Sequence, residues 1–295
     1  MLPQIEKPVS ALLDAKISTH EFDFIRTVVE KNAGIVLGNN KIQLVQGRLI
    51  RRARELGLSS IAEYCDVIRN GGPEELVDLI NAITTNVTSF FRESHHFDAL
   101  MSVMLPEAMG RNERTRRLRV WSAGCSSGEE PYSIAMAAAE NLASTRGWDF
   151  KILATDIDSE MLSLAASGRY VSERLSGVSD ERRQRWFIND TENQEGYIQV
   201  SPELQALITF RPLNLMTNWP MRGPFDVIFC RNVMIYFDQP TRDRLILRYA
   251  GLLADGGYLC LGHSESIHMQ HSHFKLVGRA IYRKAGGLVV STTQS

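Results

Sequence analysis

The stretch that decides the fold is Val120–Tyr132, VWSAGCSSGEEPY, read together with Ala154–Asp158, ATDID, one predicted strand further on. An apolar run over Leu118–Trp121 ends in a turn of small residues, and a helix is predicted to follow directly. The glycines of this turn, Gly124 and Gly128, would let a ligand approach the backbone closely. This strand–turn–helix unit is typical of a nucleotide-binding or nucleoside-binding α/β sheet.

Asp156 follows the second apolar run, where an acidic residue of a doubly wound sheet can accept hydrogen bonds from a ribose. The alternative role for this carboxylate is a helix N-cap. The turn lacks the GxGxxG pattern, and Glu129 and Glu130 occupy the helix N-terminus, where a pyrophosphate would lie. The sequence therefore favours a nucleoside that has no phosphate and carries positive charge, such as S-adenosylmethionine (SAM).

Three further motifs are Thr84–Glu93, TTNVTSFFRE, Phe229–Asp238, FCRNVMIYFD, and GHSES at 262–266. Together with the first two stretches they resemble the CheR family of chemotaxis receptor methyltransferases, from about Phe22 to about Arg283. The resemblance implies transfer of a methyl group from SAM to glutamate side chains of chemoreceptors, which gives glutamate methyl esters and S-adenosyl-L-homocysteine.

Size and composition set the class of protein. The chain has 295 residues, a net charge of −1 and four scattered cysteines, which favours reduced thiols in a cytosolic protein. The N-terminus lacks the pattern of a signal peptide, and no apolar run reaches the roughly 20 residues that span a bilayer. We expect a soluble cytoplasmic protein, a monomer, without affinity for nucleic acid and without membrane insertion.

The chain is predicted to contain two domains. Residues 1–20 form a flexible lead, 21–85 an all-α N-terminal domain, 86–284 the methyltransferase domain and 285–295 a flexible tail. The second domain is predicted to be α/β, with a Rossmann-like class I methyltransferase sheet. Its candidate strands are Leu118–Trp121, Lys151–Ala154, Thr209–Arg211, Phe225–Phe229 and Tyr258–Leu261, closed by a hairpin at Phe274–Lys284.

A small antiparallel β-subdomain is predicted to interrupt this alternation at about 171–207, with Trp186–Ile188 and Tyr197–Val200 as short strands. In some CheR proteins the matching unit captures a peptide from the receptor's C-terminal end by strand addition. Gly196–Val200 and Thr209–Arg211 would help to supply such an edge, away from the cofactor site. A hairpin that only covers the sheet is the alternative.

Methylation of a carboxylate requires alignment rather than a strong base, because a glutamate with a pKa of about 4.3 is already ionised. Arg92 is the first catalytic candidate, since a guanidinium can hold a carboxylate by two parallel bonds. Its alternative role is an ion pair with Glu93 or Glu129. Tyr236 is the second candidate, and a core tyrosine is its alternative.

The family resemblance also implies which residues contact the cofactor. Asp156 is carried over as the ribose ligand, Arg92 lies beside the methyl donor, and Glu129 would pair with a positive charge of SAM. The other matching positions are Asn86, Thr88, Asn214, Leu215, Arg231 and Asn232. A first-turn helix carboxylate is the alternative for Glu129, and a polar turn is the alternative for Asn214.

No metal is predicted. His95 and His96, and the group His268, His271 and His273, have no cysteine or carboxylate at ligand spacing.

The predicted helix Lys41–Glu55 carries a basic face next to its apolar stripe: Lys41, Arg48, Arg51 and Arg52. A solvated face is one interpretation. The family uses this helix to meet the acidic, glutamate-bearing receptor coiled coil, which makes these four residues candidates for partner binding.

Two other functions compete with receptor methylation. A nucleic-acid methyltransferase would use the basic runs at 48–54 and 111–119, but the chain has no basic excess and no Asn-Pro-Pro-Tyr or paired-cysteine methylation motif. A non-catalytic SAM sensor is disfavoured because Arg92 and Tyr236 are both present.

Overall fold

The computed structural model describes residues 16–142, 147–189, 196–267 and 273–286. Their contacts define two compact units: residues up to Thr85 together with Tyr236–Asp238, and Asn86–Ile235 together with Gln239 onward. Most of the predicted lead and tail, 1–15 and 287–295, lies outside the described residues, as does the turn at 190–195.

The first unit is helical in its described residues, as predicted for 21–85. Its elements are α1 (Thr19–Ala33), η2 (Asn39–Lys41), α2 (Ile42–Glu55), α3 (Ile61–Asn70) and α4 (Pro73–Ile83). Helix α1 begins at Thr19, inside the predicted lead, because Ser18 and Glu21 cap it reciprocally: the Glu21 N–H donates to the Ser18 hydroxyl at 3.2 Å and the Ser18 N–H to Glu21 Oε2 at 2.7 Å.

The second unit is built on a seven-stranded sheet of order β6-β2-β1-β7-β8-β10-β9. The strands are β1 (Arg117–Ala123), β2 (Asp149–Asp156), β6 (Ile208–Pro212), β7 (Phe225–Cys230), β8 (Leu253–Leu261), β9 (Phe274–Gly278) and β10 (Ile281–Lys284). The five strands from β6 to β8 are parallel, and β10 runs antiparallel to both of its neighbours. The predicted sheet and closing hairpin are confirmed.

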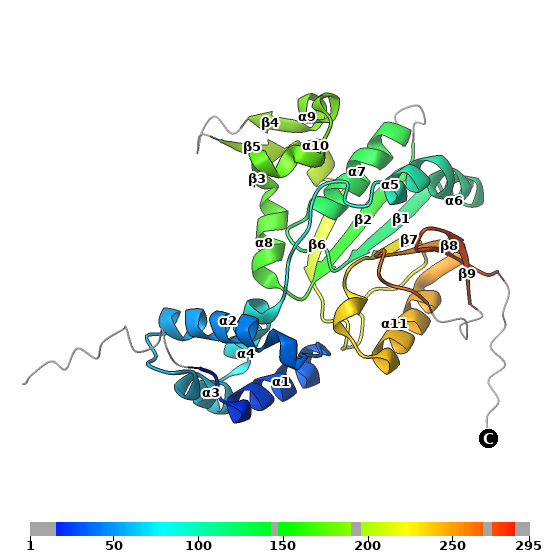
Figure 1. The fold of residues 1–295 in the computed structure, drawn as a ribbon. Helices are drawn as coiled ribbons and strands as arrows, with labels where there is room; N and C mark the ends of the chain where they lie inside the picture. The colour runs from blue at the N-terminus through cyan, green and yellow to red at the C-terminus, as the bar shows by residue number, and fades with distance from the viewer. Residues whose placement is uncertain (1–15, 143–146, 190–195, 268–272, 287–295) are drawn as a thin grey trace, which may run out of the picture. The chain divides into compact units, whose positions relative to one another are not determined.

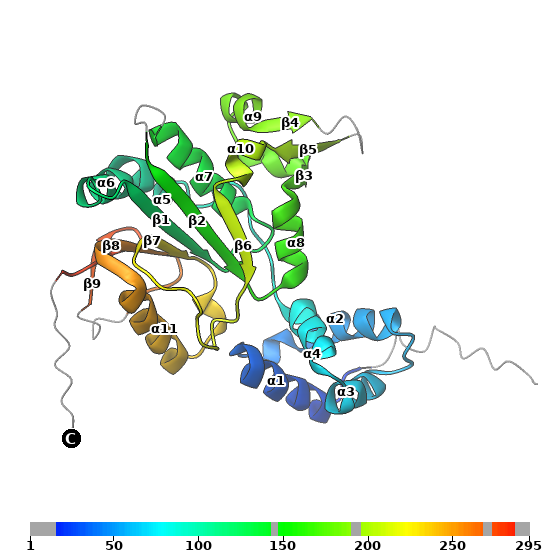
Figure 2. The same cartoon turned by 180° about the vertical axis from the view of Figure 1, so that it is seen from behind.

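Helices cover both faces of this sheet, so β7 is buried along its whole length and β1 over its last four residues. In both views α5 (His95–Ala99), α6 (Leu105–Arg111) and α7 (Glu129–Leu142) lie along one face, and α11 (Gln239–Leu252) lies along the other (Figure 1, Figure 2). A π-helical turn, η3 (Leu100–Met104), joins α5 to α6. Within the described residues, no helix combines the length and the apolar character that spanning a membrane requires.

A separate three-stranded antiparallel sheet of order β3-β5-β4 follows α8 (Ser159–Ser167). It comprises β3 (Arg169–Val171), β4 (Phe187–Asn189) and β5 (Tyr197–Val200), with η4 (Ser172–Gly177), α9 (Asp180–Trp186) and α10 (Pro202–Gln205). The predicted β-subdomain is confirmed, but β3 was missed because three residues carry no usable alternation. Trp186 ends helix α9 rather than starting a strand. Thr209–Arg211 pairs with β2 in the main sheet, so this segment supplies no edge to the small sheet.

Candidate methyl-transfer site

The site lies where the chain reverses its direction across the main sheet. From β1 the chain runs outward to β2 and β6, and then returns to β7 on the other side of β1. The crevice outside the carboxyl ends of β1 and β7 is the position at which open α/β sheets bind ligands. The turns after β1, β2, β6 and β7 and the segment before α5 carry most of the candidate residues.

The turn after β1 is tightly packed against other parts of the chain. A Cβ at Gly124, where φ is +85°, would lie 2.3 Å from Val233 Cγ2, and one at Gly128, where φ is +96°, would lie 2.8 Å from the Tyr170 hydroxyl. Both glycines are therefore required for contacts inside the protein, whereas the sequence had suggested ligand approach. Ser126 between them also adopts a positive φ, of 49°.

Asp156 ends β2 and is 92% buried, with an exposed fraction of 8%. Its Oδ2 accepts from the Ser126 N–H at 2.7 Å and its Oδ1 from the Asp158 N–H at 2.9 Å. Burial raises the pKa of this carboxyl group. The Ile157 backbone also donates to this carboxylate, which leaves one of its roughly four acceptor positions for a ribose hydroxyl. The N-cap alternative is wrong for Asp156, because Asp158 caps α8 by accepting from the Glu160 and Met161 N–H groups.

The segment from Asn86 to Glu93 lies against these turns. The Asn86 side chain donates to Asp158 Oδ2 at 2.7 Å, and its carbonyl accepts from the Ser126 hydroxyl at 3.1 Å. Thr88 is half-buried further along this segment. Phe91 and Glu93 adopt left-handed φ values of 53° and 55°, which concentrates backbone strain at this point.

Arg92 stands between these two strained residues and is half-buried. Its Nη1 donates to the Val87 carbonyl at 2.7 Å. Within the described part of the chain its guanidinium makes no ion pair, because Glu93 pairs with Arg231 and Glu129 pairs with Arg174. The alternative role for Arg92, a structural ion pair with Glu93 or Glu129, is therefore wrong.

Arg231 follows β7 and its side chain is 2% exposed. Its Nη1 lies 3.0 Å from Glu130 Oε2 and its Nη2 lies 3.3 Å from Glu93 Oε2, and it also donates to the Arg92 carbonyl. Although burial opposes it, the His263 hydrogen bond and the Arg231 charge lower the pKa of Glu93 to about 2. The Arg231 side chain thus braces the segment 86–93 against α7, a role that the sequence did not indicate.

Asn232, the next residue, has a φ of 60° and is fixed by Glu265 of the GHSES motif. The buried Glu265 carboxylate accepts from the N–H groups of Asn232 at 2.9 Å, Gly262 at 2.6 Å and Ile235 at 3.2 Å. The sequence analysis identified the GHSES motif but assigned no role to Glu265. A glutamate that stabilises three backbone N–H groups has no signature in the sequence itself.

Glu129 is fully buried at the start of α7, and its carboxylate is already paired within the chain. Arg174 donates to its Oε1 at 2.6 Å and the Ser127 hydroxyl to its Oε2 at 2.7 Å. Arg174 comes from η4 of the β-subdomain, and Tyr170 of β3 donates to the Ser127 carbonyl at 2.7 Å. Two residues of the β-subdomain therefore contact the turn after β1 and the start of α7.

Asn214 and Leu215 follow β6 in a turn beside β2. The Leu213 N–H donates to the Asp156 carbonyl at 2.8 Å, and Asn214 Oδ1 accepts from the Met216 N–H at 2.9 Å. Asn214 therefore forms the polar turn that was its alternative role, and Leu215 is buried next to it.

Tyr236 ends η5 (Met234–Tyr236) and belongs by its contacts to the helical unit. Its hydroxyl donates to the Thr85 carbonyl at 3.4 Å, and Lys41 Nζ lies 5.0 Å from the centre of its ring. Its catalytic role stays a prediction.

A carboxylate does lie near the paired histidines, contrary to the sequence analysis: the donor atoms of Glu93, His95 and His96 are within 4.8 Å of one another. Arg231 already supplies the positive charge that Glu93 requires. Burial, followed by the Arg231 charge, lowers the pKa of His96 to about 3. We assign no metal to this cluster. His268 and His271 lie outside the described residues.

The basic residues of α2 are mostly engaged within the helical unit. Arg48 donates to the carbonyls that end α4, those of Ala82, Ile83 and Thr84, at 3.1, 2.5 and 2.5 Å. Arg52 binds Glu75 at 2.8 Å and also Asp78. Arg51 differs, because its side chain is 84% exposed and, among the residues that the structure describes, its ion pair is with Glu55 along the helix surface.

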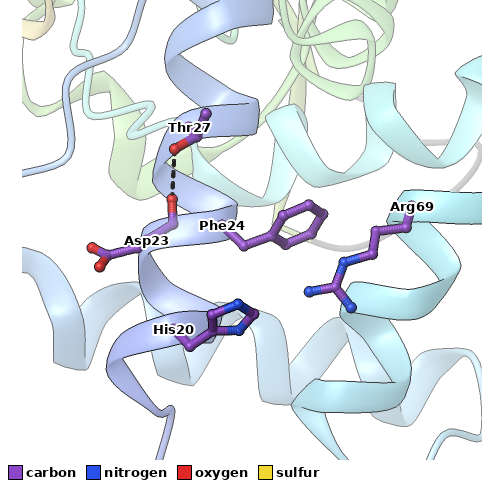
Figure 3. A pocket seen from close by; sticks show the side chains of 5 residues that line it. All are labelled: His20, Asp23, Phe24, Thr27 and Arg69. Carbon is purple, nitrogen blue, oxygen red and sulfur yellow. Dashed lines mark hydrogen bonds between the residues drawn. The ribbon is translucent and has the colours of Figure 1, made fainter.

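A groove on the helical unit is lined by His20, Asp23, Phe24, Thr27 and Arg69 (Figure 3). The Arg69 guanidinium lies 4.4 Å from the centre of the Phe24 ring and also binds Asp66. None of the predicted site residues lines it.

Comparison with known proteins agrees with this architecture. The model of the CheR methyltransferase all-alpha domain matches residues 20–84, and that of the CheR methyltransferase SAM binding domain matches residues 86–283. A probable chemotaxis protein methyltransferase of Rhizobium etli is 43% identical over 87% of this chain and 96% of its own. The chemotaxis protein methyltransferase of Escherichia coli is 42% identical over 90% and 91%. Chemotaxis protein methyltransferase 2 of Pseudomonas aeruginosa is 41% identical over 94% and 98%.

Fold and site together define a SAM-dependent methyltransferase. The chain belongs to the CheR methyltransferase family. The residues present fit SAM, because the buried Asp156 can accept from a ribose and the N-terminus of α7 carries Glu129 and Glu130 rather than groups that would bind phosphate.

Proposed function

We propose that the protein transfers the methyl group of SAM to the γ-carboxylate of glutamate residues in chemoreceptor cytoplasmic domains. The products are glutamate methyl esters and S-adenosyl-L-homocysteine. The observation that carries the proposal is Arg92, a half-buried residue whose carbonyl accepts from Arg231 in the turn after β7 and whose guanidinium makes no ion pair among the described residues. Such a group suits an anionic acceptor.

The chemistry requires alignment and shielding. When bound, SAM supplies a methyl group made electrophilic by its sulfonium centre. In our proposal Arg92 holds the acceptor carboxylate, while Asn86, Thr88, Asp156, Asn214, Leu215 and the backbone at Arg231 and Asn232 line the cofactor. No base is needed, because the acceptor glutamate is already ionised. Burial raises the pKa of the Cys125 thiol, so this residue in the turn is not an active nucleophile.

Tyr236 is proposed as the second residue of the reaction, and Tyr236→Phe tests it. We expect unchanged cofactor affinity and reduced turnover; normal turnover would remove the hydroxyl from the mechanism.

Incubation with methyl-labelled SAM and a receptor domain, DNA or RNA distinguishes the competing functions. We expect label on the receptor alone, released as methanol in mild alkali, because carboxyl methyl esters hydrolyse readily. Base-stable label would indicate N-methylation. Label on nucleic acid would support the rival enzyme, and cofactor binding without any transfer would support a sensor.

We also propose that the small sheet captures a receptor C-terminal peptide and thereby tethers the enzyme near its substrate. The order β3-β5-β4 leaves β3 and β4 as its two outer strands. Gly196, directly before β5, has a φ of 90°, and a Cβ built on it meets no atom of the described residues within 4 Å. Calorimetric titration with a panel of receptor C-terminal peptides tests this. If no peptide binds and tailless receptors are methylated normally, the sheet is structural.

We further propose that the enzyme works in the cytoplasm as a monomer. All four cysteines are free and buried, which fits a reducing compartment. A mass in solution that differs from that of a single chain would contradict the proposal that the enzyme is a monomer.

A further inference from the structure

The turn that carries Arg92 places a bulky residue in a conformation that it rarely adopts. The Arg92 N–H donates to the Ser89 carbonyl at 3.3 Å, which makes Phe91 the third residue of a tight turn. Phe91 has a φ of 53°, and a left-handed residue at this position of a turn is normally glycine or asparagine. A phenylalanine keeps such a conformation only when its surroundings hold it there.

Three other non-glycine residues of the site are also left-handed: Glu93, Ser126 and Asn232. Each has a polar partner, which is an ion pair for Glu93 and a buried carboxylate at the backbone N–H for the other two. The Phe91 side chain has no polar group, and its N–H donates to the Ser133 hydroxyl at 2.9 Å. The conformation of Phe91 therefore also depends on the packing of its ring.

The Phe91 ring contacts an aromatic ring and a guanidinium group. Phe97 of α5 packs edge-on against it, with ring centres 5.2 Å apart and an angle of 70° between the planes. The Arg182 guanidinium carbon lies over the Phe91 ring, 4.2 Å from its centre. A cation in this position is attracted by the negative face of the ring. Since Arg182 belongs to α9, this contact comes from the β-subdomain.

Arg182 is itself fixed by Glu140 of α7. Its Nε donates to Oε1 at 2.9 Å and its Nη2 to Oε2 at 2.8 Å, and its side chain is 25% exposed. Two parallel hydrogen bonds fix the plane of a guanidinium as well as its position. Because the charge of Arg182 is already paired, this residue does not compete with Arg92 for an acceptor carboxylate. It can act on the reaction through the ring that it covers.

The β-subdomain also contacts the residue before Phe91. The Phe90 ring is buried, and its centre lies 5.1 Å from that of Tyr170 and 5.6 Å from that of Phe187, both edge-to-face. A Cβ at Gly177 would lie 2.7 Å from the Phe90 carbonyl oxygen, so the backbones of the subdomain and the turn are in close contact. Both aromatic residues of the turn therefore pack against the subdomain.

We propose that Arg182 is a positioning residue for methyl transfer: it holds the Phe91 ring and thereby keeps the guanidinium of Arg92 aligned with the acceptor carboxylate. The inference rests on the proposed function, in which Arg92 holds that carboxylate. It gives the β-subdomain a part in the reaction that does not depend on peptide capture. Transfer to an ionised carboxylate depends on alignment, so a small displacement of Arg92 lowers the rate.

Arg182→Met tests the inference, because it keeps the length of the side chain and removes the guanidinium. We expect kcat/KM for receptor domains to fall about tenfold, while the affinity for SAM, measured by calorimetry, stays unchanged. Arg182→Lys keeps a cation near the ring and should recover part of the loss. Arg185→Met is the matched control, since Arg185 of the same helix lies 4.5 Å from the centre of the Trp186 ring instead and its loss should leave kcat/KM unaltered.

The same substitution in an Arg92→Ala background separates positioning from a general loss of structure. If Arg182 acts through Arg92, Arg182→Met has no further effect on kcat/KM once residue 92 is alanine, because the two substitutions remove one shared interaction and are not additive. An equal fall in both backgrounds, or no fall in the wild-type background, would overturn the inference. Arg182 and Glu140 would then form a salt bridge that only joins α9 to α7.

Hydrogen exchange, followed by mass spectrometry, gives a readout independent of turnover. Peptides that cover residues 89–93 should exchange faster in Arg182→Met than in the wild type and in Arg185→Met. Equal exchange in all three proteins would overturn the inference. If the wild-type protein transfers no methyl group to receptor domains, or if Arg92→Ala has normal turnover, the proposed function fails, and the exchange rates still decide whether Arg182 holds the turn.

Discussion

At the residue scale, the site depends on which charged groups are already paired within the chain. Glu93 is paired with Arg231, and Glu129 with Arg174. Arg92 is held by a carbonyl, which fixes its position but leaves its charge uncompensated by any described ion pair. A guanidinium in this state binds a carboxylate without first having to release another.

Arg92→Ala should therefore lower kcat/KM for receptor by about 10²- to 10³-fold, the usual effect of removing one preorganised donor that faces developing charge. Arg92→Lys should recover part of this loss, because it keeps the charge but not the paired donors. Steady-state kinetics and SAM titration measure both effects. Arg114→Ala, in the exposed basic loop before β1, is the control. A turnover near that of the wild type in Arg92→Ala would exclude the residue from the mechanism.

At the element scale, the turn after β7 is held by one buried carboxylate. Glu265→Gln keeps the shape of the side chain but places an NH₂ group among backbone N–H donors. We expect a loss of about 1.5–3 kcal/mol in the free energy of unfolding, the range for hydrogen bonds to a charged group, together with weaker SAM binding. Urea unfolding and SAM titration check this. The exposed neighbour Ser264→Ala should change neither, and equal stability of the two variants would contradict the role of Glu265.

Two neighbouring arginines of α2 should behave differently on charge reversal. Arg52→Glu replaces a cation whose side chain is 20% exposed and faces Glu75 and Asp78, so we expect a loss of about 1–3 kcal/mol in unfolding free energy. Arg51→Glu alters an exposed charge and should change stability by less than about 1 kcal/mol. Urea titration of both variants measures the difference. Similar losses would mean that the pairs of Arg52 do not stabilise the unit.

The elements that sequence predicted well are those with long periodic signals. The apolar periodicity of α1 and α2 and the buried runs of β1, β2 and β7 locate these elements to within a few residues. Strand β3 has three residues, too few for any period, and was missed. The pairs Arg174–Glu129 and Arg231–Glu93 join residues far apart in the chain, so no local pattern could assign them.

At the scale of the whole molecule, buried histidine links stability to pH. The pKa of His96 is about 3, below its reference value of 6.5, because of burial and then the charge of Arg231. His95 also opposes protonation of the ring, whereas Glu93 and a hydrogen bond with the Arg279 carbonyl at Nε2 favour it. The unfolded chain therefore binds more protons than the native one between these pH values, and stability falls as pH decreases through this window.

Removing the imidazole should remove its share of this dependence. Between pH 6.5 and 4, His96→Gln should lose less stability than the wild type, by up to about 1.4 kcal/mol per pH unit. Urea unfolding at several pH values gives both curves. Parallel curves for the two proteins would show that His96 does not titrate differently in the native and unfolded states.

The grouping of Tyr236–Asp238 with the first 85 residues has a consequence for anyone who wishes to exchange domains between relatives. The Tyr236 carbonyl accepts from the Val36 N–H at 2.8 Å, so the surroundings of this short segment are encoded about 200 positions earlier in the chain. A chimera joined once, after Thr85, would combine one parent's helices with the other parent's tripeptide. A functional graft therefore needs three junctions instead of one, and the two donor pieces must come from the same parent.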